Sequence, residues 1–173
     1  MLPPSELGAR LDRILAHGVT LVAALPGRAL DETPPQIEGS VRDLAFRLFR
    51  RSLAYVDGMD MGELRGAWLR EPAPPDLVDG PAVARYGALV RGRVAGWFEG
   101  AGIREFARTI STESGTDNGH ALLERTVAQA AQCLRQLHAV SRPSSGKTIN
   151  PLPLSDFEGL PLPASPWEER RSP

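Results

Sequence analysis

Apolar side chains recur along this chain at intervals of three and four residues, in segments separated by stretches rich in Pro and Gly. This spacing is typical of one face of an α-helix, whose residues advance by about 100° each. It predicts four helices, over residues 5–25, 40–59, 81–99 and 118–141. Residues that favour helix starts stand at the predicted boundaries: Ser40 precedes Asp43 by three residues, Pro81 stands in a first turn, and Asn118 is a cap candidate. Strand-like alternation is confined to residues 102–111, so the sequence predicts an all-α fold.

The C-terminal residues follow a different pattern. Prolines at 143, 151, 153, 161, 163, 166 and 173 exclude a regular helix or a central strand. The segment is nevertheless too apolar for a simple solvated tail, because it contains Leu152, Leu154, Phe157, Leu160, Leu162 and Trp167. We expect residues 150–168 to lie extended across the bundle and to cover the mouth of its central cavity; a disordered terminus is the alternative.

Length and composition favour one compact domain, with a helical bundle over residues 1–142 and an extended tail over 143–173. Of the 173 residues, 42% are hydrophobic and 24% charged, as in ordinary globular proteins. A net charge of −1 argues against nucleic acid or anionic membranes as partners. The single Cys excludes an intrachain disulfide, and neither a signal layout nor a long apolar run is visible. These features predict a cytoplasmic protein.

The segment LLERTVAQAAQCLRQL, residues 122–137, places two chemically notable side chains on or beside a buried helix face. Cys133 lies on the apolar side, and Gln129 lies four residues earlier at its edge. The simpler interpretation is a buried thiol that only packs and an amide that bonds locally, because free Cys is often buried without a role. The alternative is a functional site.

This segment resembles the last helix of the DinB-like superfamily, metal-dependent four-helix bundles that include bacterial thiol S-transferases. Residues 41–60 (VRDLAFRLFRRSLAYVDGMD), 84–100 (ARYGALVRGRVAGWFEG) and 157–167 (FEGLPLPASPW) resemble the same family. The resemblance implies a bundle with one long crossover, and relatives of this fold commonly pair through helices. Because the apolar arc of the second predicted helix is broad, we expect a homodimer; coverage of the same arc by the tail is the alternative.

In that family one His on the second helix and an H-x3-H pair on the last helix hold a divalent metal. The resemblance places Arg47, Gln129 and Cys133 at these three positions. Arg is a fixed cation, Gln is a weak ligand and one thiolate cannot hold zinc alone, so we expect no metal and no cofactor. By helix angle alone, Arg47 lies about 60° from Leu44, at the border of the apolar arc; only the family match moves it inward.

An Arg, a Gln and a Cys around one cavity would suit an anionic small molecule. Arg47 would grip a carboxylate or phosphate, Gln129 would orient a carbonyl or amide, and Cys133 near a cation would gain thiolate character as a nucleophile. Trp97 and His120 are further ligand-binding candidates, with core packing as the alternative for Trp97. Arg50 and Arg51 beside Arg47 either help to bind an anion or form a solvated helix flank.

Three functions remain open from the sequence. The first is a metal-independent enzyme that isomerises, adds to or cyclises an anionic substrate by positioning and polarisation. The second is a non-catalytic small-molecule-binding or interaction protein of the same fold. The third is a metal-dependent thiol S-transferase whose ligands lie elsewhere in the chain.

Overall fold

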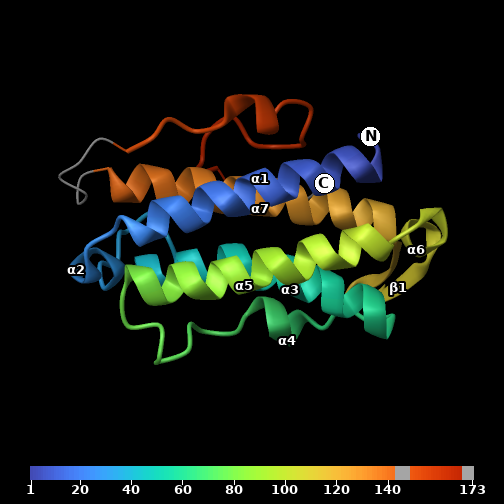
Figure 1. Cartoon of the computed structure of the whole chain (residues 1–173), viewed down its shortest axis with the longest axis horizontal. Helices are drawn as coiled ribbons and strands as arrows, with labels where there is room; N and C mark the ends of the chain where they lie inside the picture. The colour runs from blue at the N-terminus through green and yellow to red at the C-terminus, as the bar shows by residue number, and fades with distance from the viewer. Residues whose placement is uncertain (143–148, 169–173) are drawn as a thin grey trace.

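Four long helices form the framework of the molecule in the computed structural model, which describes residues 1–142 and 149–168. They are α1 (Pro4–Ala23), α3 (Val41–Met61), α5 (Gly80–Gly100) and α7 (Gly119–Ser141) (Figure 1). Helices α1 and α3 each pack along both α5 and α7, so α1 lies diagonally opposite α3 in the bundle. Residues 62–79 run back along the bundle to join α3 to α5 (Figure 1). The predicted all-α bundle with a long crossover is therefore confirmed.

The helix ends follow the sequence signals closely. Ser40 caps α3 by accepting a hydrogen bond from the Asp43 backbone N–H at 3.1 Å, and the Asp43 carboxylate accepts from the Ser40 N–H at 3.0 Å. Asn118 caps α7 in the same manner, accepting from the Ala121 N–H at 2.8 Å. Gly62 ends α3 at a φ of 79°, a conformation that favours glycine.

Short elements join the long helices. They are α2 (Gly27–Leu30), α4 (Gly66–Leu69), α6 (Ile103–Ala107), the antiparallel hairpin of β1 (Thr109–Thr112) and β2 (Gly115–Asn118), and the 3-10 turn η1 (Leu154–Asp156). The segment 102–111, which shows strand-like alternation, is divided between two elements: Ile103–Ala107 form α6, and β1 begins at Thr109. Backbone bonds from Leu64 N–H to Ser111 O (2.8 Å) and from Ser111 N–H to Gly62 O (3.0 Å) fix the hairpin to the end of α3.

The bundle core is dense where large and small side chains face each other. Phe49 of α3 is fully buried and lies against Gly87 of α5, where an added Cβ would stand 2.5 Å from the ring. Tyr55, also buried, donates to the Gly119 carbonyl at 3.2 Å and so joins α3 to the start of α7. The first contact packs α3 closely on α5, and the second joins α3 to α7, the two helices that form the floor of the site described below.

The C-terminal tail packs on the bundle, as predicted, over residues 149–168; residues 143–148 and 169–173 of the predicted tail lie outside the described part of the chain. It crosses α1 and α7 (Figure 1), with Phe157 and Leu160 buried. Arg135 of α7 donates to the Pro163 carbonyl at 2.8 Å and to the Ala164 carbonyl at 2.9 Å. The end of the tail therefore lies beside α7. Among the described helices, none has the length and apolar character needed to cross a membrane.

Candidate functional site

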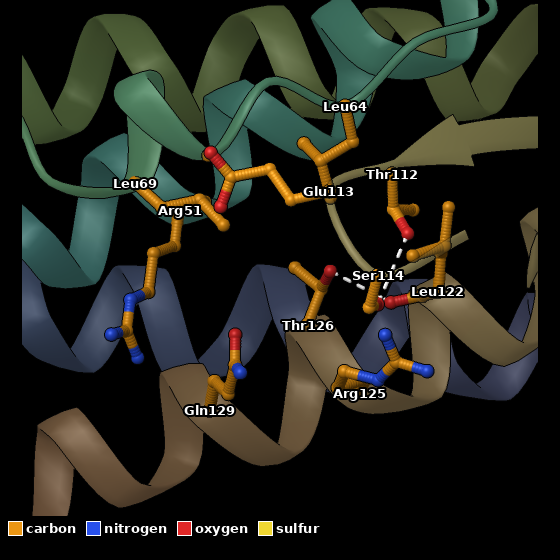
Figure 2. A pocket seen from close by; sticks show the side chains of 11 residues that line it. Arg51, Leu64, Leu69, Thr112, Glu113, Ser114, Leu122, Arg125, Thr126 and Gln129 are labelled. Carbon is orange, nitrogen blue, oxygen red and sulfur yellow. Dashed lines mark hydrogen bonds between the residues drawn. The ribbon is translucent and has the colours of Figure 1, made fainter. Parts of the chain in front are cut away.

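A cavity of about 240 Å³ opens between α3, α7 and the tip of the hairpin. Arg51 enters it from α3, and Thr126 and Gln129 enter it from α7 (Figure 2). Helix α4 and the hairpin turn at Glu113 form the opposite walls. Two bundle helices thus give the floor, while the long crossover and the hairpin, which are distant in sequence, complete the sides.

Arg51 is the cation of this cavity whose charge is not paired with a carboxylate of the described residues. Its Nε atom is buried without a hydrogen-bond partner, and no salt bridge joins its guanidinium to a carboxylate of the described residues. The sequence held a signal for this position: Arg51 is seven residues after Leu44, about 20° away on the helix, and Leu44 is fully buried. A cation therefore occupies a core-facing position of α3.

Gln129 and Arg125 face the same cavity from α7. In the view of Figure 2 the Gln129 amide stands between the side chains of Arg51 and Arg125. Arg125 is paired with Asp117 of β2, whereas the Gln129 amide forms no hydrogen bond with another described residue. The amide is therefore available to donate to, or accept from, a guest.

The hairpin tip contributes polar groups that sequence reasoning missed. The Thr112 and Ser114 hydroxyls lie 3.3 Å apart at the cavity wall, and the exposed Glu113 carboxylate accepts two hydrogen bonds from Arg70, at 2.7 and 3.0 Å. The bond from Arg70 holds the pKa of Glu113 below its usual range. Glu113 is thus a poor proton acceptor, tied to α4 at the edge of the cavity.

Cys133 belongs to the core and does not line this cavity. Its side chain is only 4% exposed, and burial raises the pKa of the thiol, although the Arg51 and Arg47 cations act in the opposite direction. The protonated thiol is accordingly the form present near neutral pH. The expected thiolate character would require exposure or a closer cation.

The other predicted site residues lie elsewhere. Arg47 is turned toward the loop before α3, where it donates to the Glu38 carbonyl at 2.7 Å. Trp97 donates to Asp60 at 3.0 Å within an aromatic cluster on α5, and His120 lies with one ring nitrogen 2.7 Å from the Leu2 carbonyl. The structure therefore brings Gln129 together with Arg51, one helical turn beyond Arg47, and does not gather all five candidates in one cavity.

The donors around the cavity do not fit a divalent metal. Arg51 and Arg125 are cations that repel one, and Glu113 is held by Arg70. Residues 1–142 and 149–168 contain no cluster of three or more His, Cys, Asp or Glu side chains suited to hold a metal ion. We therefore derive no chemistry through a metal at this site.

Comparison with solved structures assigns the fold of a DinB-like four-helix bundle to this chain. The crystal structure of a DinB-like protein, YjoA of Bacillus subtilis, is similar to this chain with a TM-score of 0.68 at 13% sequence identity. The likeness covers 84% of this chain and 96% of that protein. No family model and no curated protein sequence matches the chain. The likeness establishes the fold, and the function must be argued from the residues of the cavity.

Proposed function

We propose that this protein binds an anionic small molecule in the cavity between α3, α7 and the hairpin, with Arg51 as the residue that holds the anion. The observation that carries the proposal is the guanidinium that lines the cavity with a buried, unpartnered Nε. A cation withdrawn from water gains most from a charged acceptor, and a guanidinium fits carboxylate and phosphate in bidentate fashion.

The remaining cavity groups suit orientation of the guest. Gln129 offers an amide that can both donate and accept, and the hydroxyls of Thr112 and Ser114 line the opposite wall. These neutral groups beside the Arg51 guanidinium would distinguish ligands by the geometry of the groups next to the anion, since unmatched polar groups in a partly closed site are costly. This is the arrangement of a selective binding site.

Binding is the part of the sequence hypothesis that the cavity supports. Proton transfer has weaker support, because Glu113 is paired with Arg70 and burial favours the protonated Cys133 thiol. Isomerisation, addition or cyclisation of the bound anion remains a prediction, as does the replacement of family metal ligands by Arg47, Gln129 and Cys133. In this proposal the anion is held by a guanidinium and not by a metal.

Titrations of the full chain with inorganic phosphate and with acetate, followed by NMR, test the proposal. We expect saturable shifts at the Gln129 amide, and Arg51→Gln should weaken binding by about 1.5–3 kcal/mol, the worth of a hydrogen bond to a charged group. Arg85→Gln on the exposed side of α5 is the matched loss of one positive charge and should leave the affinity unchanged.

Arg47→Gln distinguishes the two arginines of α3. Little change in this variant is expected, because Arg47 faces the Glu38 carbonyl. If Arg47→Gln abolishes binding while Arg51→Gln does not, the anion site is the one implied by the family resemblance. Equal binding by all variants would refute an arginine-held anion altogether.

A further inference from the structure

A second hollow, of about 670 Å³, lies along α7 beneath the C-terminal tail and shares two lining residues, Arg125 and Gln129, with the cavity of Arg51. One wall is the outer face of α7 and the other is the segment Pro161, Leu162 and Pro163 of the tail. We call this hollow the tail groove. Because Arg125 and Gln129 line both spaces, the cavity of Arg51 and the tail groove adjoin at these two side chains.

The wall of the tail groove is fixed by specific contacts. Gln132 and Gln136 of α7 each donate to the Pro166 carbonyl, at 2.6 and 2.9 Å, and Arg135 holds the Pro163 carbonyl. The Gln132 and Gln136 amide groups are thus already engaged by the protein, whereas the Gln129 amide has no such partner among the described residues. One free amide therefore stands at the junction, and the groove beyond it offers apolar contact from Ala128, Leu162 and the prolines.

The charges of the lining residues indicate which end of a ligand would lie in each of the two spaces. The tail groove contains the carboxylates of Glu124 and Glu168, and its one cation, Arg125, is paired with Asp117. An anionic group is therefore disfavoured in the groove and favoured at Arg51. The matching guest has an anion at one end, a neutral apolar arm at the other and a hydrogen-bonding amide between them.

Resting on the proposed function, we infer that the ligand class is the N-acylated amino acid: its carboxylate is bound by Arg51, its amide by Gln129, and its acyl arm lies in the tail groove. The carboxylate and amide of such a molecule are separated by a single carbon, and Arg51 of α3 and Gln129 of α7 line the same cavity (Figure 2). An acyl arm would follow α7, whose residues rise by about 1.5 Å each from Gln129 toward Gln136.

Calorimetric titration of the full chain with acetylglycine and hexanoylglycine tests this inference. Hexanoylglycine should bind about tenfold or more tightly than acetylglycine, because part of each added methylene is removed from water. Octanoate, which lacks the amide, and N-hexanoylethanolamine, which lacks the carboxylate, should both bind at least about tenfold more weakly than hexanoylglycine.

Two variants locate the parts of the ligand. Ala128→Phe fills the tail groove, so it should remove the advantage of the hexanoyl arm while acetylglycine binds as before. Gln129→Leu should make hexanoylglycine and octanoate bind alike. The comparison of acyl lengths in the unaltered protein does not depend on either variant folding.

The outcomes separate this inference from the proposed function. If both acylglycines bind equally and both are lost in Arg51→Gln, the anion site stands and the tail groove is not part of it. If octanoate equals hexanoylglycine in the unaltered protein, the assignment of the Gln129 amide is wrong. If neither acylglycine binds, or if Arg51→Gln leaves hexanoylglycine unaffected, both the ligand class and its placement at Arg51 are overturned; phosphate and acetate titrations then decide the anion site separately.

Discussion

Replacing Arg51 by Met should make the ligand-free protein more stable. The guanidinium of Arg51 has a buried Nε without a partner among the described residues, and it occupies the face of α3 that carries the fully buried Leu44 and Leu48. A buried donor left unsatisfied costs about 1–3 kcal/mol. Arg51 is only partly buried as a residue, so the lower end of that range applies. Met keeps the length of the apolar stem and removes the charge.

The expected gain in the free energy of unfolding is therefore about 1 kcal/mol, or about 2–4 °C in Tm for a chain of this size. Urea denaturation followed by circular dichroism measures it, and an unchanged m-value would show that the same surface is exposed on unfolding. Arg47→Met is the control: Arg47 donates to the Glu38 carbonyl, so its loss should lower stability slightly.

In the presence of a saturating anion, the unaltered protein should become more stable than the Arg51→Met variant. A ligand present at a hundred times its Kd stabilises the folded protein by about 2.7 kcal/mol, and only the protein that retains Arg51 would gain this. If Arg51→Met instead destabilises the ligand-free protein by more than about 1 kcal/mol, the guanidinium already has a structural partner. The reasoning that assigns it to a ligand would then be wrong.

Two further predictions concern Cys133 and assembly. The Cys133 thiol should react with a disulfide reagent much more slowly in the folded than in the unfolded protein at pH 8, since burial raises its pKa. The Cys133→Ala variant should preserve anion binding. Loss of binding in this variant would support a functional thiol. We expect a homodimer by light scattering, although the apolar arc of α3 packs on α4, α5 and α7 within the chain; a mass near 18.7 kDa would contradict it.

The four long helices could be predicted because their apolar spacing and their caps point to the same boundaries. Ser40 and Asn118 each satisfy backbone N–H groups of the helix that follows, so local chemistry alone marks the starts of α3 and α7. The hairpin could not be predicted in this way. Its strands are short and polar, Ile110 is their buried residue, and their position depends on backbone bonds to Gly62 and Leu64.

Only some residues of the candidate site could be predicted from the sequence. Gln129 was found from its place beside the apolar face of α7, and the structure brings it to the cavity. The family resemblance points to Arg47, whereas the helix angle relative to Leu44 marks Arg51 as the arginine directed inward. The tail was expected to cover the mouth of the central cavity, but no residue of 149–168 lines the cavity of Arg51; residues 161–163 instead line the hollow along the outer face of α7. No sequence pattern predicts that the hydroxyls of the hairpin tip belong to the site, because nothing in the local sequence places residues 112–114 beside α7.

The position of Arg51 links the stability of the bundle to its proposed use. A leucine or methionine at this point of α3 would extend the apolar face of Leu44 and Leu48 and would leave the cavity without a charge. In the proposed function, the arginine instead lowers the stability of the ligand-free protein and supplies the cation that an anionic guest would need. The walls that close this site come from α4 of the crossover and from the hairpin, which lie outside the four long helices. Selectivity can therefore be changed at Gln129, the hairpin tip or the tail groove while the four helices keep the guanidinium in place.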